Sequence, residues 1–194
     1  DNIEDLQEAV GTKSNPIAIP GICGIKIFMG ESTGTLLVSN RSALERIFSE
    51  TAGLIAVHAE DENRMKERKK MIQGRTDVAA HAYYRDDITA LLATKLAVEL
   101  AIKTGHRLHI LHLTSGIEAD FLADYCSLPS NSEQHPIITT EVLPQHLTFD
   151  ETDVEYDRLD YDFYDKITLS EKQKDYVKNY YYQDYKIFNN ELIT

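Results

Sequence analysis

The sequence predicts an α/β fold built on a parallel sheet, and three observations carry this prediction. Short apolar runs rich in Ile, Val and Leu alternate with amphipathic segments of helical periodicity. Their order is strand–helix–strand–helix–strand–helix–strand, which is typical of parallel α/β folds. Each of the first three runs carries one candidate functional side chain, which is Lys26, His58 and His112, respectively. Functional groups gather at the carboxyl ends of parallel strands, so we expect these side chains to share a site.

Four strands are predicted, over residues 22–29, 54–58, 107–113 and 137–143. Each is a short run bounded by glycine, proline or polar residues. The first begins after Pro20 and Gly21, because proline cannot donate to a sheet ladder. We expect a lysine within such a run to be buried, and a buried ammonium is costly unless it is paired or chemically altered.

Three amphipathic helices are predicted between the strands, over residues 42–52, 87–104 and 117–125. The first starts at a capping box formed by Ser42 and Glu45 and ends at Gly53. The second starts at Asp86 or Asp87 and ends at Gly105. Its inward-facing residues are expected to be Ile88, Leu91, Leu92, Leu96, Val98 and Leu100. Residues 60–75 carry mixed charges, which predicts a solvated helix or long loop rather than a basic partner site.

The composition is that of a globular protein with an acidic surface. The 194 residues are 42% hydrophobic and 27% charged, which suits one domain with a sizeable core. The net charge of −12 argues against a nucleic-acid or membrane partner, because both favour a basic surface. No apolar run is long enough to span a membrane, and no signal-peptide pattern opens the sequence. Cys23 and Cys126 lack metal or redox spacing, so we expect a reduced, cytoplasmic location.

The chain divides into two parts by composition. Residues 1–150 contain all four predicted strands, whereas residues 151–194 are acidic, rich in tyrosine and of uncertain structure, with one expected helix at 170–182. A complete (β/α)8 barrel takes about 250 residues. Four strands therefore predict a partial TIM-type barrel. Because the sequence starts at Asp1 without a methionine, we expect that further residues precede it.

Lys26 has two interpretations. A desolvated, neutral lysine amine can react with CO₂, and the resulting carbamate can bridge two divalent metal ions. Alternatively, Lys26 extends to water or pairs with a carboxylate. His58 and His112 are candidate zinc ligands, and carboxylates near such a ring often orient it, although histidines at strand ends also serve structural roles.

Strand alternation separates one further histidine from this site. His109 lies three residues before His112, and this odd offset predicts that His109 faces the helices instead. His146 follows the fourth strand, where it can reach the mouth of the site. The histidines in loops or turns without a partner pattern are His81, His106 and His135. The sequence has no P-loop, nucleophile elbow or dinucleotide-binding fingerprint.

Four segments together resemble consecutive signature segments of the dihydroorotases, which are part of the amidohydrolase superfamily. They read GIKIFMGESTG, LIAVHAEDE, RLHILHLTS and TTEVLPQHLTF, and the resemblance covers roughly residues 16–159. It implies a metal-dependent hydrolase barrel with a binuclear zinc centre. Carbamylated Lys26 would bridge the two metals, His58 and His112 would bind the second zinc, and His146 would contact the substrate.

The sequence also departs from the family pattern. It has no His-x-His pair for the first zinc and no arginine following such a pair, and neither an Asn-Pro segment nor an Asp-His-Ala motif follows Leu159. Gln145 and Glu31 stand where the family often has histidine and serine. The loop from Glu31 to Gly34 lacks the tyrosine typical of hydantoinases, which favours dihydroorotase among the cyclic-amide relatives.

The resemblance implies a cytoplasmic zinc enzyme that interconverts N-carbamoyl-aspartate and dihydroorotate in pyrimidine biosynthesis. Its substrates are small molecules, and a homo-oligomer or a transcarbamoylase partner is implied. Because half of the metal site and the catalytic base are missing, we expect this portion to be incomplete and inactive alone. The alternative is a catalytically inactive, dihydroorotase-like scaffold or partner-binding protein.

Overall fold

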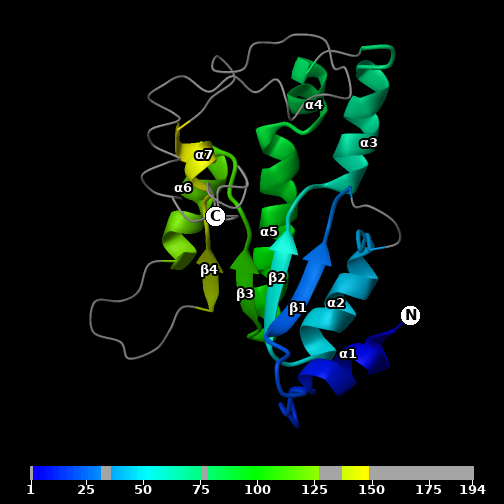
Figure 1. Cartoon of the computed structure of the whole chain (residues 1–194), viewed down its shortest axis with the longest axis vertical. Coiled ribbons are helices and arrows are strands. Elements are labelled where there is room, and N and C mark those ends of the chain that lie inside the picture. The colour runs from blue at the N-terminus through cyan, green and yellow to red at the C-terminus, as the bar shows by residue number, and fades with distance from the viewer. Residues whose placement is uncertain (1, 32–35, 76–77, 127–136, 149–194) are drawn as a thin grey trace, which may run out of the picture.

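A computed structural model describes residues 2–31, 36–75, 78–126 and 137–148 of the chain. Four parallel strands form a sheet in which the order along the chain is also the order in space (Figure 1). The strands are β1 (Gly24–Phe28), β2 (Leu54–His58), β3 (Arg107–Ile110) and β4 (Ile138–Thr140). The predicted parallel α/β fold is therefore confirmed. The acidic segment 151–194, with its expected helix at 170–182, lies outside the described residues.

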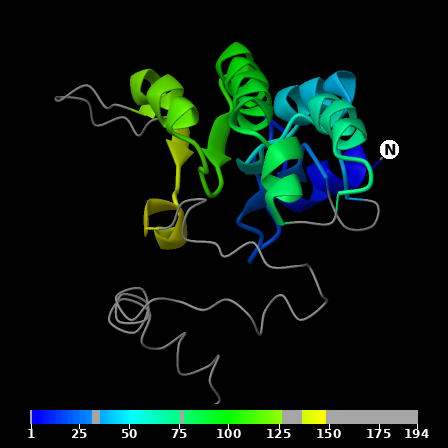
Figure 2. The same cartoon turned by 90° about the horizontal axis from the view of Figure 1, so that it is seen from above.

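The connecting helices cover one face of the sheet. Figure 2 shows α2 (Arg41–Glu50), α5 (Asp87–Thr104) and α6 (Gly116–Cys126) along the same side of the strands. The opposite face is open over the part of the chain that the structure describes. Neighbouring consecutive strands with helices on one side form the wall of a barrel, whereas a doubly wound sheet has helices on both sides. The partial-barrel prediction agrees with this arrangement.

The core lies between the helices and the covered face of the sheet. Alternate strand residues point into it, because successive side chains of a strand face opposite sides. The strand residues at most 2% exposed are Ile27, Ile55, Val57, Leu108, Ile110 and Ile138. Leu44 and Phe48 of α2 and Leu100 of α5 are fully buried against them. Each such side chain stabilises the fold by about 1.5–3 kcal/mol relative to leaving it in water.

Three strands are shorter than predicted. β1 begins at Gly24 rather than residue 22, β3 ends at Ile110 rather than residue 113, and β4 covers only 138–140 of the expected 137–143. The end of β3 has a backbone cause, because His112 adopts φ 38°, which is incompatible with an extended strand. Hydrophobicity continues to Leu113, so the sequence pattern alone extends the strand too far.

The start of α2 differs from the prediction. Asn40, not Ser42, is the N-cap residue, and its side-chain oxygen accepts a hydrogen bond from the backbone N–H of Ala43 at 3.1 Å. The Ser42 hydroxyl instead donates to the same oxygen at 2.6 Å. Asparagine is as good an N-cap as serine, which explains why two candidates only two residues apart are hard to separate. The other boundary residues, Asp86 and Gly105 of α5, act as predicted.

The buried face of α5 is made of smaller residues than the sequence pattern predicts. Ala93, Ala97 and Ala101 are at most 2% exposed, whereas Ile88 and Leu92, both expected inward, are 37% and 44% exposed. α5 packs between α2 and α6 and against β3, and small residues let a helix approach its neighbours closely. Two of the expected residues, Val98 and Leu100, are indeed buried.

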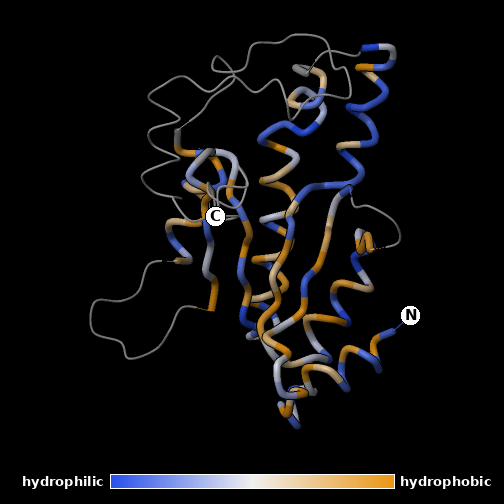
Figure 3. Tube along the Cα trace, viewed as in Figure 1, coloured by the Kyte–Doolittle hydropathy of each residue, from blue (hydrophilic) through white to orange (hydrophobic). Residues whose placement is uncertain are grey.

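Four short helices complete the described structure. They are α1 (Ile3–Val10), α3 (Glu62–Met71), α4 (Val78–Tyr84) and α7 (Pro144–Thr148). The charged segment 60–75 contains α3, which is hydrophilic along most of its length and buries Met65 (Figure 3). This confirms the solvated-helix alternative. None of the described helices combines the length and apolar character needed to cross a membrane.

Candidate functional site

The structure brings His58 and His112 together at the carboxyl ends of β2 and β3. The Nδ1 atom of His58 lies 3.0 Å from the Nε2 atom of His112. The two rings meet nearly edge to face, with centroids 4.9 Å apart. Burial, followed by the nearby charges of His58 and Lys26, lowers the pKa of His112. Both rings therefore direct a nitrogen at one point, and the neutral, metal-binding form of His112 is favoured.

A carboxylate fixes the other side of the His58 ring. The Nε2 atom of His58 lies 2.6 Å from Oε2 of Glu60, a side chain that is only 14% exposed. A carboxylate accepts, so Nε2 carries the hydrogen and Nδ1 presents its lone pair toward His112. Orienting a histidine through its second nitrogen is the usual arrangement around metal-binding imidazoles. Glu60 is therefore the nearby carboxylate that orients the His58 ring, as the sequence leads us to expect of such a carboxylate.

Glu60 belongs to a chain of charges that reaches α4. Its Oε1 lies 3.3 Å from Nε of Arg85, and Arg85 also lies 3.4 Å from Oε2 of Glu31. Glu31 in turn accepts hydrogen bonds from Lys69 at 2.8 Å and from the Tyr84 hydroxyl at 3.0 Å. The hydrogen bond from Lys69 is the main reason why the pKa of Glu31 is lowered. Ion pairs and hydrogen bonds thus connect the ring of His58 with three other parts of the chain, namely α3, α4 and the loop that follows β1.

Lys26 lies on the same face of the sheet as His58. Lys26 of β1 is in register with Ala56 of β2, two residues before His58. Its Nζ sits 4.6 Å from the centre of the Phe28 ring, which is itself 5.8 Å from the His58 ring. Lys26 was expected to be buried, but it is exposed, because it projects from the uncovered face. Partial burial still lowers the pKa of its ammonium, with Glu141 opposing this effect.

The prediction that His109 faces the helices is wrong. Its register partners are Ala56 and Thr139, so it shares the open face with Lys26. His112 reaches the same face despite the odd offset because β3 ends at Ile110 and the positive φ of His112 breaks the alternation. The alternation of strand side chains therefore no longer applies at His112, two residues past the end of β3.

Glu141, at the end of β4, is a site residue that sequence reasoning missed. Its Oε1 accepts the backbone N–H of His112 at 3.3 Å, and its Oε2 lies 3.3 Å from Nε2 of His109. The other nitrogen of His109 is 2.9 Å from the Thr139 hydroxyl. The available signal was its position near the carboxyl end of the predicted strand 137–143, since functional groups gather at such ends.

The remaining histidines divide by location. His146 of α7 is exposed and its Nδ1 lies 3.0 Å from the carbonyl oxygen of Leu113, the residue after His112. His106 is buried and bonds to the Phe48 carbonyl, which is a structural role. His81 lies 3.1 Å from Arg85. His135 is outside the described residues.

The donor set at the histidine pair fits zinc. Two nitrogens bound to one tetrahedral zinc ion at about 2.0–2.1 Å lie about 3.4 Å apart, close to the separation found here. Imidazole nitrogen is a ligand that zinc favours. Among the described residues, however, no group of three or more His, Cys, Asp or Glu side chains is arranged to hold a metal ion. The histidine pair can therefore supply part of a site, and Lys26 projects from the same face of the sheet.

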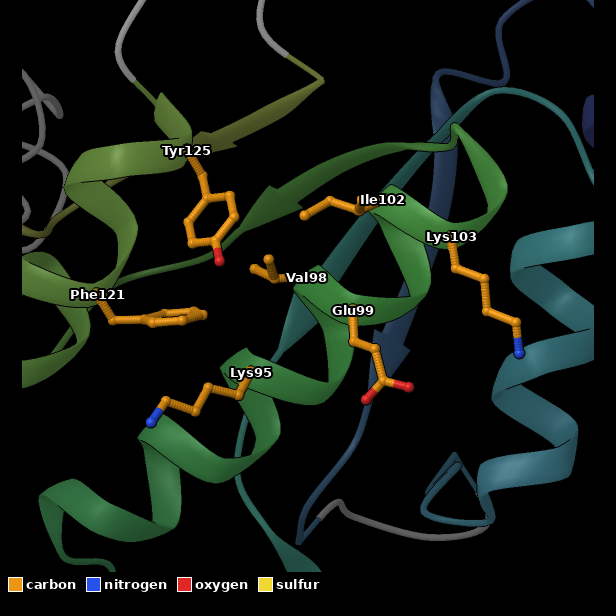
Figure 4. Close-up of a pocket in the computed structure, with 7 residues that line it drawn as sticks. All are labelled: Lys95, Val98, Glu99, Ile102, Lys103, Phe121 and Tyr125. Atoms are coloured by element: carbon orange, nitrogen blue, oxygen red, sulfur yellow. The ribbon is translucent and has the colours of Figure 1, made fainter.

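A hollow lies on the outer side of the helix layer, between α5 and α6. Figure 4 shows its lining, which consists of Lys95, Val98, Glu99, Ile102, Lys103, Phe121 and Tyr125. Nζ of Lys95 lies 5.4 Å from the centre of the Phe121 ring. The hollow contains no histidine or cysteine and belongs to the helix layer, whereas Lys26 and His109 project from the opposite face of the sheet. Its lining therefore offers no imidazole like those of His58 and His112.

Comparison with known proteins places these features in a family context. A dihydroorotase of Methanosarcina mazei is 27% identical over 124 residues, which is 63% of this chain and 27% of the relative. An allantoinase of Bacillus velezensis is 28% identical over 140 residues, covering 69% and 30% of the two chains. The L-hydantoinase of Arthrobacter aurescens superposes with a TM-score of 0.59 at 26% identity, over 69% of this chain and 30% of that structure. No protein-family model matches the chain.

The chain is a partial homologue of the cyclic amidohydrolases, and its sheet corresponds to part of their TIM-type barrel. It spans between a quarter and a third of the length of the relatives just described. The family resemblance and the partial-barrel fold expected from the sequence are thus confirmed.

Proposed function

We propose that this chain carries the lysine and two-histidine part of a binuclear zinc site in a dihydroorotase-type cyclic amidohydrolase. The observation that carries the proposal is the 3.0 Å separation of His58 Nδ1 and His112 Nε2, on the face of the sheet that also bears Lys26. His58 and His112 would bind one zinc ion, and Lys26, as a carbamate, would bridge it to a second. A bound zinc ion supplies Lewis-acid polarisation of an amide carbonyl and activation of water.

The residues of the chain prepare this site in two ways. Glu60 holds the hydrogen of His58 on Nε2, so that the lone pair of Nδ1 points toward His112. The lowered pKa of Lys26 increases the fraction of neutral amine. That amine attacks the carbon of CO₂, forms an N–C bond and releases one proton, which leaves a carbamate anion with two oxygen ligands.

The proposed substrates are dihydroorotate and N-carbamoyl-aspartate, with His146 near the mouth of the site as a substrate contact. The dihydroorotase relative supports this substrate class, and the allantoinase and hydantoinase relatives supply competing cyclic amides. We place the reaction in pyrimidine biosynthesis in the cytoplasm. Assays with dihydroorotate, allantoin and hydantoin under one set of conditions separate these classes.

We further propose that activity requires more than this chain. The sequence contains no His-x-His pair for the first zinc, and the chain spans only 27% of the dihydroorotase relative. β1 and β4 are the outer strands of the described sheet, and outer strands offer unpaired backbone groups to a partner. A second copy of the chain or a transcarbamoylase is the proposed partner.

Two measurements on the purified chain test the zinc proposal. Elemental analysis should find zinc that is lost in Lys26→Ala and retained in Lys95→Ala, a lysine from the helix layer. Carbon-13 NMR after equilibration with labelled CO₂ should show a carbamate signal that disappears in Lys26→Ala only. A folded chain with neither zinc nor carbamate would favour the alternative, a catalytically inactive dihydroorotase-like scaffold or partner-binding protein.

A further inference from the structure

The backbone of His112 is held in an unusual conformation. Its φ of 38° lies in the left-handed region, which few residues other than glycine adopt. Such a conformation persists only where surrounding contacts fix it. It is also what turns the imidazole toward His58, since an extended residue at this offset would point to the other face. The contacts that fix this backbone therefore decide whether the histidine pair forms.

Glu141 supplies those contacts on both sides of His112. Its backbone N–H donates to the Ile110 carbonyl at 3.1 Å, and its own carbonyl accepts the Leu113 N–H at 2.9 Å. Its side-chain Oε1 accepts the His112 N–H at 3.3 Å. Glu141, directly after β4, therefore forms hydrogen bonds with the chain before, at and after the left-handed residue.

The Glu141 carboxylate is in turn fixed by His109. Nε2 of His109 lies 3.3 Å from Oε2 of Glu141, so the N–H on that nitrogen donates to the carboxylate. Nδ1 of the same ring is 2.9 Å from the Thr139 hydroxyl. The His109 ring is thus fixed at both nitrogens and hydrogen-bonds to Oε2 of Glu141. The other oxygen, Oε1, points at the backbone N–H of His112.

We propose that Glu141 is the positioning residue that aims His112 at His58, with His109 holding Glu141 in place. This rests on the proposed metal site for its functional meaning, but its structural content does not require metal. Removal of the carboxylate leaves the His112 amide without its acceptor, and the ring then loses its fixed direction. Zinc affinity falls as a consequence, because the two nitrogens no longer converge.

Glu141→Ala and Glu141→Gln form a matched pair for the test. The glutamine amide oxygen can still accept the His112 N–H, whereas alanine cannot. The backbone hydrogen bonds of residue 141 persist in both variants, so β4 stays attached to β3. Asp120→Ala removes an exposed carboxylate from α6 and controls for the change in net charge.

The first readout is the nuclear Overhauser effect between the ring protons of His58 and His112 in the metal-free full chain. We expect it in the unmodified chain, in Glu141→Gln and in Asp120→Ala, and we expect its loss in Glu141→Ala. The second readout is calorimetric titration with Zn²⁺, in which Glu141→Ala should bind about tenfold more weakly. Circular dichroism verifies that each variant is folded.

Retention of the ring contact and of zinc affinity in Glu141→Ala would overturn the positioning role. Equal loss in Glu141→Gln and Glu141→Ala would also overturn it, because the amide keeps the acceptor. An unmodified chain that shows the ring contact, loses it in Glu141→Ala and binds no Zn²⁺ would support the positioning role while contradicting the proposed metal site.

Discussion

His58 and His112 are 54 residues apart in the sequence, yet their Nδ1 and Nε2 atoms lie 3.0 Å from each other. The parallel pairing of β2 with β3 creates this proximity, because it brings the carboxyl ends of both strands to one edge of the sheet. Glu60 orients the first ring, and the left-handed backbone turns the second toward it. The pair is the most specific chemical feature of the described residues.

The first prediction concerns the hydrogen bond from His58 to Glu60. Glu60→Ala removes the acceptor at 2.6 Å and frees the ring to rotate or to change tautomer. Zinc affinity should fall by about 10- to 100-fold, as is usual when the partner of a metal-binding histidine is lost. Calorimetric titration with Zn²⁺ measures this, with the exposed Glu67→Ala of α3 as control. Equal affinities of both variants would show that Glu60 does not orient the ring.

The second prediction concerns the pH dependence of stability at the start of α5. Asp86 receives hydrogen bonds from Arg64 at 2.9 and 2.6 Å and from the backbone and hydroxyl of Thr89. The Arg64 hydrogen bond is the main reason why the pKa of Asp86 lies far below its usual value. The carboxylate therefore stabilises the fold above the unfolded-state pKa of about 3.9, and this contribution is lost as pH falls toward the folded-state pKa.

Asp86→Asn tests this because asparagine is also a good N-cap and removes only the charge. The free energy of unfolding should be lower in the variant at pH 7, and the difference from the unmodified chain should shrink below about pH 4. Urea denaturation at a series of pH values provides the measurement, with Asp87→Asn as the neighbouring control. A difference that stays constant down to pH 2 would contradict the assignment.

The third prediction concerns the small-residue face of α5. Ala97 is fully buried, so Ala97→Leu should destabilise the chain by about 1–3 kcal/mol through overpacking. Leu92 is 44% exposed, so Leu92→Ala should change stability by no more than about 0.5 kcal/mol. Thermal and urea unfolding of the two variants test the assignment. The reverse order of effects would mean that the large residues face the core, as the sequence pattern predicts.

Much of the fold was predictable because its determinants are local. The apolar runs located all four strands, and Asp86 and Gly105 marked the ends of α5, since caps and hydrophobic periodicity act within a few residues. The buried face of α5 was not predictable in this way. Periodicity identifies the large apolar residues, but the space left between α2, α6 and β3 decides that alanines lie innermost.

The site shows the same division. Lys26, His58 and His112 could be selected as candidates because each stands in or after an apolar strand. The residues that surround these candidates could not be predicted from the sequence. Glu141 is 29 residues from His112 and Arg85 is 25 residues from Glu60, and only tertiary structure brings such pairs together. The backbone of His112 depends on β4, so sequence parity placed His109 on the wrong face. Lys26 is exposed for a similar reason, since its burial depends on what covers the inner face of the sheet.

Zinc titration of the histidine pair tests the central claim most directly. Calorimetry on the full chain should find one Zn²⁺ site, and His58→Ala and His112→Ala should each weaken it by more than about tenfold, because even loss of a ligand's hydrogen-bond partner has that effect. Cys23→Ser, which removes an exposed free thiol, should leave the site unchanged. If the folded chain binds no zinc, or if both histidine variants bind it as tightly as the unmodified chain, the pair is not a metal site.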